Sequence, residues 1–402
     1  MKRAIFAFSS SAFAFVFAMG IVNLFGDMTY EGGASINGPF LQSLGAGAAT
    51  ISIIAGLGEF LGYSLRSVAG YIADKTQRFW LVTFIGYTIN LLAVPAMTLA
   101  GNWQVAALCI FAERIGRAIR KPTVEAMLSY STGKLGKGWV YALNSALDET
   151  GATIGPLLMA LALYQKASFR TSYGLLLISS LLALVALVAA RLVFPLPSRL
   201  EHGGTRTAGA KGFTATFWLS MVAAACFGAG LMSFEFISFH LASRGTMTEH
   251  WIPLGLAIST GVGVGVGLLL GRLYDRIGLP VILAAIAVAS FFSPLVFFGG
   301  FATALAGLLL WGLGYVIQDT LFKALVAGML PEGRRNFAFG LFYTGYGVGW
   351  LVGSIASGLL YEHSITAVVV FSVVIQLASI PLLVIAQRMG RPSKTHPVKA
   401  HG

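Results

Sequence analysis

The chain alternates between long apolar runs and short polar breaks along its whole length. Trp80 to Trp103 and Tyr173 to Ala190, for example, contain no charged residue. About 20 such residues are needed for a helix to cross the hydrocarbon core of a membrane. The apolar residues follow one another without period-two alternation, which excludes a β-barrel. The pattern therefore predicts a bundle of membrane-spanning helices.

Taken in order, the runs and breaks predict twelve spanning helices, near residues 5–30, 46–72, 79–100, 103–130, 137–164, 170–193, 214–242, 250–271, 279–299, 302–329, 336–361 and 365–388. The first run has a basic start like that of a signal peptide, but we interpret it as the first span. Pro195 and Pro197 lie in the one long polar connection, which is typical of a linker. We expect an N-terminal six-helix bundle (1–193), a cytoplasmic linker (194–212), a C-terminal six-helix bundle (213–390) and a basic cytoplasmic tail (391–402).

Composition agrees with the membrane prediction. Hydrophobic residues make up 56% of the chain and charged residues 10%, whereas roughly a quarter of the residues of a soluble domain are charged. The formal net charge is +12, but the basic residues gather at every second connection, and the others hold only Lys166, Arg170 and Arg244. The positive-inside rule then places both termini and the linker in the cytoplasm, with the chain in the inner (plasma) membrane. This distribution marks sidedness and argues against nucleic-acid binding.

One charged turn occurs twice. A glycine, an aspartate four residues later and a basic residue recur at Gly70, Asp74 and Arg78 and again at Gly271, Asp275 and Arg276. Asp275 follows Asp74 by 201 residues, half of the 402-residue chain. A repeat at half the length predicts two similar halves in tandem.

This turn resembles the signature loop of the major facilitator superfamily, which lies between the second and third membrane helices and has a degraded copy between helices eight and nine. The resemblance implies an all-α membrane protein with twelve transmembrane helices in two pseudo-symmetric six-helix bundles. It implies secondary active transport by alternating access, with helices one, four, seven and ten lining the path. It also implies that Asp74 and Asp275 act as conformational latches at the cytoplasmic side, where Arg120 is able to pair with Asp74.

Two further stretches resemble parts of that superfamily. Gly151, Gly155 and Pro156 resemble the glycine–proline signature on helix five of its antiporter branches, and glycines at this spacing also allow close helix contact. The fourth helix, from Arg114 to Glu125, is similar in part to a prokaryotic efflux-type subgroup. The common helix-four pattern of the superfamily places a glycine four residues after its arginine, but Ala118 stands there relative to Arg114 and Lys121 relative to Arg117. Which arginine takes the proton-relay role of this helix is therefore left open.

Ionisable residues inside spans are the candidates for function, because each costs on the order of 3 kcal/mol or more in the membrane. Asn23, Asp27 and Glu31 are four residues apart and form one polar stripe on the first helix. Asp27 has no basic residue within a turn, so burial favours its protonated form unless an arginine arrives from another helix. We predict that Asp27 carries the coupling proton, that Arg114 or Arg117 approaches it, and that the other candidate carriers are Glu31, Glu59 and Glu235.

Other polar residues in the spans are candidates for the substrate cavity, namely Asn23, Arg66, Arg114, Arg117, His240, Asp319 and Lys323. Structural interpretations stay open for several of them. Asp319 and Lys323 are four residues apart and are able to neutralise each other. Arg117 and Arg120 approach the cytoplasmic end, and His240 approaches the outer surface. Aromatic residues suited to the cavity are Phe234, Phe236, Phe239, Trp311, Tyr315, Tyr343 and Tyr346.

The function that the sequence favours is export of a small organic molecule in exchange for protons. The alternatives are import of an organic anion bound by Arg66 and Arg114, export of a metal or metal chelate, and a non-transporting receptor. The metal would bind Asp27, Glu31, Glu235 and His240. No Walker loop, nucleophile motif or metal-ligand spacing is present, so we predict neither an enzyme nor a cofactor. The expected partners are a small-molecule substrate, protons and the lipid bilayer, with the monomer as the working unit and no nucleic acid.

Overall fold

A computed structural model describes residues 2–129, 131, 137–195, 214–327, 329 and 335–390, and within them the chain is helical with no β-strand. The first half consists of α1 (Lys2–Ser43), α2 (Ala48–Thr76), α3 (Phe79–Ala96) with η1 (Met97–Leu99), α4 (Trp103–Ser129), α6 (Lys137–Tyr164) and α7 (Phe169–Val193). The second consists of α8 (Ala215–Leu231) with α9 (Phe234–Ser243), α10 (Trp251–Ile277), α11 (Leu279–Ala289) with α12 (Phe292–Phe298), α13 (Phe301–Val316) with η3 (Ile317–Leu321) and α14 (Phe322–Ala327), α15 (Arg335–His363) and α16 (Ile365–Gly390).

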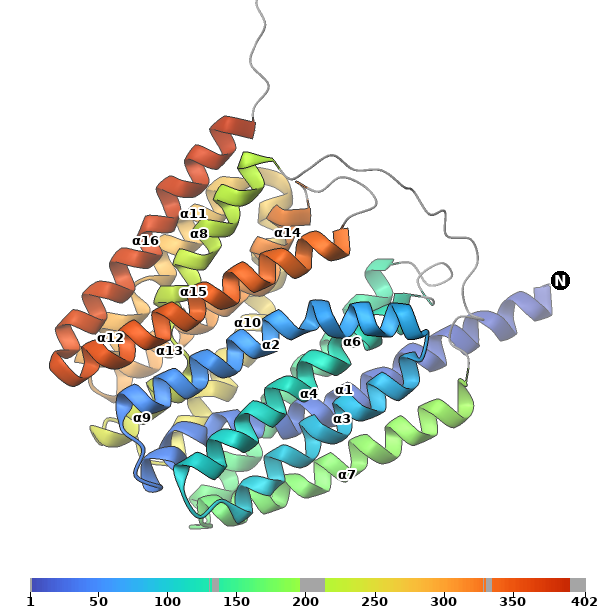
Figure 1. The fold of residues 1–402 in the computed structure, drawn as a ribbon, viewed down its shortest axis with the longest axis horizontal. Helices are drawn as coiled ribbons and strands as arrows, with labels where there is room; N and C mark the ends of the chain where they lie inside the picture. The colour runs from blue at the N-terminus through green and yellow to red at the C-terminus, as the bar shows by residue number, and fades with distance from the viewer. Residues whose placement is uncertain are drawn as a thin grey trace, which may run out of the picture.

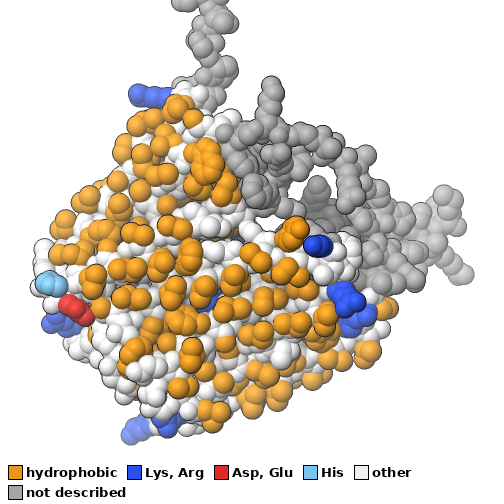
Figure 2. Space-filling view, viewed as in Figure 1, with side chains coloured by type: hydrophobic (Ala, Val, Ile, Leu, Met, Phe, Trp, Pro, Cys, Tyr) orange, Lys and Arg blue, Asp and Glu red, His pale blue; other side chains and the backbone are white. Residues whose placement is uncertain are grey.

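These elements make twelve spans in two six-helix bundles, which confirms the predicted fold class (Figure 1). Ten of the spans are long and apolar enough to cross a membrane, and α4 and α15 are equally long but more polar. Hydrophobic side chains cover most of the described surface in Figure 2, and charged side chains show mainly at its margins. Such a surface fits contact with lipid. The predicted linker lies almost wholly outside the described residues, as does the basic tail.

The first span is longer than we predicted. We expected it to end near residue 30, but α1 continues through Glu31 and two glycines to Ser43. The glycines do not break the helix, because they allow close packing. A Cβ atom at Gly32 would lie 3.0 Å from the Leu176 side chain, and one at Gly33 would lie 2.7 Å from Val94. The prediction of the end near residue 30 was therefore wrong by about three and a half helical turns.

Three predicted spans are interrupted. The seventh is broken between α8 and α9, the ninth between α11 and α12, and the tenth contains the π-helical turn η3. At the first break Met232 has a φ of 60°. The carbonyl groups freed there still have donors: Gln376 Nε2 donates to the Gly230 carbonyl (3.0 Å) and Trp311 Nε1 to the Met232 carbonyl (3.0 Å). A break inside a membrane span is stable only when neighbouring helices satisfy the backbone in this way.

The two halves are in contact at the end of the molecule that lies opposite the N-terminus, and α2 continues to contact α15 as far as Ser67 and Gly340 (Figure 1). At that end α1 packs on α9, since a Cβ atom at Gly38 would lie 2.1 Å from the Glu235 carbonyl oxygen. Beside this contact, Ser52 Oγ of α2 donates to the Ser354 carbonyl of α15 (2.6 Å). We call this end, formed by the last turns of α1, α9 and α15 and the first turns of α2, the closed end.

Helices α1 and α6 approach each other at glycines of the predicted helix-five motif. A Cβ atom at Gly151 would lie 2.1 Å from the Leu24 carbonyl oxygen, and one at Gly155 would lie 2.3 Å from that of Met28. Both obstacles are backbone atoms, which cannot move aside as a side chain does. The two contacts lie on either side of Asp27 in the α1 sequence, so they fix α6 beside that residue.

Gly155→Ala is expected to destabilise the protein by about 1–3 kcal/mol, because α6 must move away from α1. Thermal unfolding of the purified protein in detergent measures this loss. Gly265→Ala is the matched control, since a Cβ atom at Gly265 has no neighbour within 4 Å. The control should unfold at the wild-type temperature or above it, because alanine favours helix. Equal unfolding temperatures for the two variants would contradict the close packing of α1 and α6.

Candidate functional site

The first cluster of buried charges surrounds Arg120 of α4. Its guanidinium donates through Nη2 to Asp27 Oδ1 (3.0 Å) and through Nε to Asn90 Oδ1 (3.1 Å). Nη1 lies 3.2 Å from the Tyr87 hydroxyl and 3.5 Å from Asn23 Oδ1. Arg120 is 4% exposed and Asp27 is 8% exposed. This Arg120 cluster therefore joins α1, α3 and α4 through one buried ion pair with neutral hydrogen-bond partners around it.

The second cluster surrounds Arg114, two turns earlier on α4. Arg114 Nη2 lies 3.1 Å from Glu59 Oε1 and 3.0 Å from Glu235 Oε1, and Nε lies 3.5 Å from Glu113 Oε2. Nη1 donates to the Tyr30 hydroxyl. One guanidinium thus faces three carboxylates in a buried position. A single positive charge cannot neutralise three negative ones, so this Arg114 cluster has more carboxylates than its one guanidinium can pair with.

The Arg114 cluster also crosses between the halves. Arg114 belongs to α4 in the first half and Glu235 to α9 in the second. Glu235 is 3% exposed, and its backbone packs against Gly38 at the closed end. The ion pair therefore links the two halves beside the place where they are joined.

Tyr30 and Glu31 lie between these clusters. The guanidinium of Arg117 lies 3.9 Å from the centre of the Tyr30 ring, and that of Arg114 lies 5.0 Å from it. Both are cation–π distances. Glu31 lies within electrostatic range of Arg117, but it makes no ion pair within the described residues.

A third group of charges lies between the halves. We call it the inter-half cluster, and it comprises Arg66 (α2), Lys121 (α4), Glu149 (α6), Asp319 (η3) and Lys323 (α14). Lys323 Nζ lies 2.8 Å from Asp319 Oδ1, and the two side chains are 41% and 65% exposed. Lys121 and Arg66 act electrostatically on Asp319, and Asp319 acts on Glu149. Since Arg66, Lys121 and Glu149 all belong to the first half, Asp319 lies on the side of its helix that faces that half.

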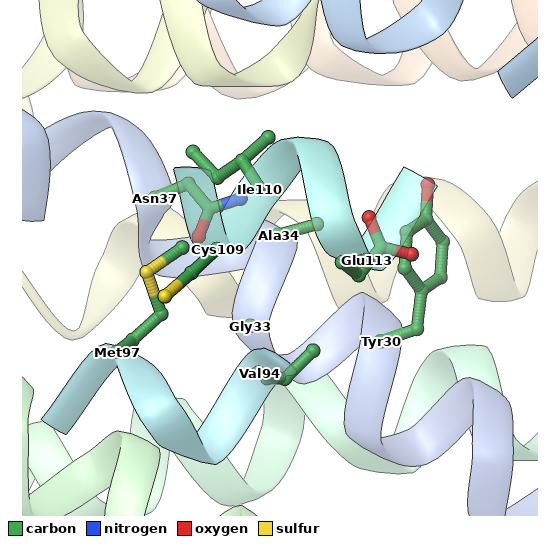
Figure 3. A pocket seen from close by; sticks show the side chains of 9 residues that line it. All are labelled: Tyr30, Gly33, Ala34, Asn37, Val94, Met97, Cys109, Ile110 and Glu113. Atoms are coloured by element: carbon green, nitrogen blue, oxygen red, sulfur yellow. The ribbon is translucent and has the colours of Figure 1, made fainter. Parts of the chain in front are cut away.

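A small pocket lies beside the Arg114 cluster, inside the first half (Figure 3). It is lined by Tyr30, Gly33, Ala34, Asn37, Val94, Met97, Cys109, Ile110 and Glu113. It has room for about one water molecule. The Glu113 carboxylate also accepts a hydrogen bond from Asn90 Nδ2 (2.7 Å), and Asn90 bonds Arg120. Glu113 and Asn90 therefore connect the two buried clusters.

Comparison with known proteins decides the family. The model of the Major Facilitator Superfamily matches residues 4–326. The chain belongs to the major facilitator superfamily. An uncharacterized protein of Mycobacterium tuberculosis (strain H37Rv) is 33% identical over 381 residues, which cover 93% of each chain. An uncharacterized MFS-type transporter of Methanocaldococcus jannaschii is 26% identical and covers 87% of this chain and 89% of its own.

Solved structures agree on the fold of this superfamily member. The nucleoside transporter NupG superposes with a TM-score of 0.70 at 14% identity, over 94% of this chain and 99% of that one. A peptide transporter POT in complex with sulfate superposes with a TM-score of 0.71 at 13% identity, over 93% and 94%. These identities show the fold alone. Membership of the superfamily makes the chain a multi-pass membrane protein and a secondary transporter of small molecules, not an enzyme.

The geometry differs from our expectation for the partner of Asp27. We expected Arg114 or Arg117 to approach it, and we grouped Arg120 with the loop carboxylate Asp74. The structure places Arg120 on Asp27, whereas Arg114 faces three glutamates. The sequence gives positions along each helix but not the level at which α1 and α4 cross. That level decides which arginine reaches the carboxylate.

Several residues of the Arg120 and Arg114 clusters were not predicted from the sequence. Tyr30, Tyr87 and Asn90 are uncharged residues in apolar runs, and nothing in the sequence distinguishes them from packing residues. Glu113 did carry a signal, because it is a charged residue inside a span. We did not include it in the predicted site.

The predicted latch cannot be followed in the structure, because the Asp74 side chain lies outside the described residues. Gly70 packs on Pro122, with a Cβ position 3.6 Å from the proline ring. Arg78 is exposed just before α3, and Asp275 and Arg276 are exposed at the end of α10. The latch role of this motif stays a prediction.

The residues proposed for a metal are not brought together. His240 Nδ1 lies 2.8 Å from the Tyr361 hydroxyl, and its ring lies 4.4 Å from that of Phe297. Asp27 and Glu235 instead contact different arginines. In the part of the chain that the structure describes, no group of three or more His, Cys, Asp or Glu side chains is suited to a metal ion.

The aromatic candidates for the cavity fall into two groups. Those with buried side chains are Phe234, Phe236, Phe239, Trp311 and Tyr346. Tyr315 and Tyr343 are partly accessible. Tyr343 stacks on Tyr63 with 5.7 Å between ring centres, and the Arg66 guanidinium lies 5.6 Å from the Tyr343 ring. Tyr343 is thus the aromatic side chain next to the inter-half cluster.

Proposed function

We propose that this transporter exports a small organic molecule in exchange for protons, by rocking of its two halves, and that it works as a monomer. The observation that carries the proton coupling is the buried ion pair between Asp27 Oδ1 and Arg120 Nη2 (3.0 Å). We further propose that it lies in the inner membrane with both termini and the linker in the cytoplasm, as the distribution of basic residues favours.

Asp27 has the surroundings that a proton carrier needs. In the structure the Arg120 guanidinium forms an ion pair with its carboxylate. When Asp27 takes a proton, the charge attraction between α1 and α4 is lost, while Arg120 keeps its hydrogen bonds to Asn90 and Tyr87. Protonation therefore weakens the attraction between α1 and α4, while Arg120 keeps its neutral hydrogen bonds. Such a difference between two states is what couples proton binding to a conformational equilibrium.

The Arg114 cluster extends this coupling to the other half. Because three carboxylates share Arg114, protons and the guanidinium compete for them. A proton on Glu235 removes the charge attraction between α4 and α9 beside the closed end. A proton gradient is thereby able to bias the opening of that end, and the rocking motion of the halves follows from it.

Exchange and export are supported by the helix-five motif. Gly151 and Gly155 hold α6 against α1 on either side of Asp27. This motif resembles the one of the antiporter branches, and the fourth helix resembles an efflux-type subgroup. Together these resemblances favour movement of substrate and protons in opposite directions.

Import of an organic anion together with protons is the second candidate, and Arg66 favours it. Arg114, which we also considered for the anion, is occupied by carboxylates. Arg66 makes no ion pair within the described residues, and its Nε is buried without a hydrogen-bond partner. A substrate anion would supply that partner. The two candidates differ in whether protons move in the direction opposite to the substrate or in the same direction.

The sign of a pH change distinguishes exchange from import. Purified protein is placed in liposomes that contain a pH-sensitive dye, and organic compounds are added outside one at a time. In exchange, entering substrate drives protons out, so the interior becomes alkaline. In import with protons the interior becomes acidic. We expect protein-dependent alkalinisation, and acidification by the same compounds would overturn the proposed exchange.

A further inference from the structure

We propose that the substrate is an organic anion and that its anionic group binds between the halves, to Arg66 and Lys121 on one side and Lys323 on the other. This inference rests on the transport function proposed above. It names the chemical class of the substrate and the residues that bind its charge.

The first observation is that solvent reaches this place. The side chains of Asp319 and Lys323 are 65% and 41% exposed although they belong to a membrane span. Asp319 lies on the π-helical turn η3, and such turns are frequent at functional sites. A charged side chain at membrane depth is stable only in a watery space or with a partner. The space between the halves is therefore accessible to a dissolved ligand at this level.

The second observation is that Arg66 and Lys121 of the first half lie within electrostatic range of each other and form no direct ion pair within the described residues. The strongest charge interactions of Lys121 are with two other cations, Arg117 and Arg66, and those with Asp148 and Asp319 are weaker. Three positive groups of α2 and α4 thus repel one another. An anion bound among them removes this repulsion.

The third observation concerns the guanidinium of Arg66. It lies 4.8 Å from the centre of the Tyr63 ring and 5.6 Å from that of Tyr343. The rings hold the guanidinium in place, while its Nε remains buried without a hydrogen-bond partner. A buried donor without an acceptor destabilises the protein, and a ligand oxygen that accepts its hydrogen bond would remove this penalty. A carboxylate or phosphate also suits the planar fork of an arginine.

Asp319 shows where the anionic group would lie. The charges that act most strongly on its carboxylate are all cations: Lys323, Lys121 and Arg66. These cations come from α2, α4 and α14, so they enclose one position from both halves. Glu125 also acts on Lys323, less strongly than Asp319 does, and Glu149 lies within electrostatic range of Asp319, Lys121 and Lys323. A ligand anion would compete with Asp319 for this position and displace its exposed carboxylate.

Binding at this position would also link the halves. Arg66 and Lys121 lie in the later turns of α2 and α4, and Lys323 lies in α14, all far along helices that lead away from the closed end. An anion that contacts both sides adds an attraction between the halves there. Substrate binding thereby favours the state in which that end closes, which alternating access requires.

Three probes with the same ring and different charge test the inference. Benzoate, benzyl alcohol and benzylamine are titrated onto the purified full chain in detergent, with phenyl phosphate as a second anion. Calorimetry and the rise in unfolding temperature report binding, because a ligand of the folded state stabilises it by mass action. We expect one or both anions to bind at least about tenfold more tightly than the alcohol and the amine, since a charged hydrogen bond contributes that much.

The anion affinities of single variants show which residues form the binding site. Arg66→Gln and Lys121→Gln should each weaken binding of the anion by about tenfold or more. Asp319→Asn should strengthen it, because the competing carboxylate is gone and Lys323 is released. A purely structural role of Asp319 would not produce this gain. Arg388→Gln, which removes an exposed cation at the end of α16, is the control and should bind like the wild type.

Any of three results overturns the inference: neither anion binds, benzylamine binds more tightly than both, or Arg66→Gln and Lys121→Gln bind the anion as the wild type does. Gel filtration of each variant shows whether it folds. If Arg66→Gln does not fold, the anion affinities of Lys121→Gln and Asp319→Asn decide whether the inference holds. No proton gradient is present in these titrations, so they report the anion site whether or not Asp27 carries the proton. Failure of proton coupling and failure of the anion site are thus observed separately.

Discussion

Asp27→Asn is expected to reduce proton-driven transport to the level of empty liposomes while substrate binding persists. The amide is almost the same size as the carboxyl group, and its oxygen is still able to accept the hydrogen bond of Arg120. It can neither gain nor lose a proton, so the interaction between α1 and α4 no longer depends on the proton gradient. Substrate moving down its own concentration gradient should still cross the membrane.

Flux in liposomes with and without an imposed pH gradient measures this effect. Glu249→Gln is the matched control, because it neutralises an exposed carboxylate in the connection before α10. It should transport like the wild type under both conditions. If Asp27→Asn responds to the pH gradient as strongly as the control, Asp27 has a structural role. The proton carrier would then be sought at Glu31, Glu59 or Glu235.

The arrangement of spans could be predicted from the sequence because each span needs a run of apolar residues about 20 long. The runs give their number and approximate limits directly. The breaks inside the seventh, ninth and tenth spans could not be predicted in this way. At the break beside Met232, for example, Trp311 donates to the Met232 carbonyl 79 residues away, and Gln376 donates to the Gly230 carbonyl 146 residues away.

The charged residues of the site could be predicted for a similar reason. Asp27, Glu59, Arg114, Arg120 and Glu235 stand out because charge is rare in these spans. Their pairing could not be predicted, because the Asp27–Arg120 contact joins residues 93 apart and depends on how two helices cross. A spacing of three or four residues reports neighbours on one helix only. The ion pairs of Arg120 with Asp27 and of Arg114 with Glu59 and Glu235 instead join different helices, and the last of these joins the two halves.

Arg114→Gln is expected to lower the free energy of unfolding by about 3–5 kcal/mol, because it leaves buried carboxylates without their cation. Glu59, Glu113 and Glu235 all lie within 3.5 Å of this guanidinium. Glu235→Gln should cost less, since Arg114 keeps its contacts with Glu59 and Glu113. Thermal unfolding at fixed pH compares the variants. In the double variant the loss should be smaller than the sum of the two single losses, because one unpaired carboxylate is removed together with the cation.

The same variants report on opening of the closed end. Ser238 is buried where α9 meets Gly38 of α1, so a cysteine placed there reacts with a water-soluble thiol reagent only when the halves separate. In a background without Cys109 and Cys226, Ser238→Cys should be labelled slowly. Glu235→Gln should speed the labelling, because the charge attraction between α4 and α9 is lost while the fold is retained. If the labelling rate stays unchanged and Arg114→Gln unfolds at the wild-type temperature, the Arg114–Glu235 pair does not hold the halves together. The closed end would then depend on packing of α1 against α9 and of α2 against α15.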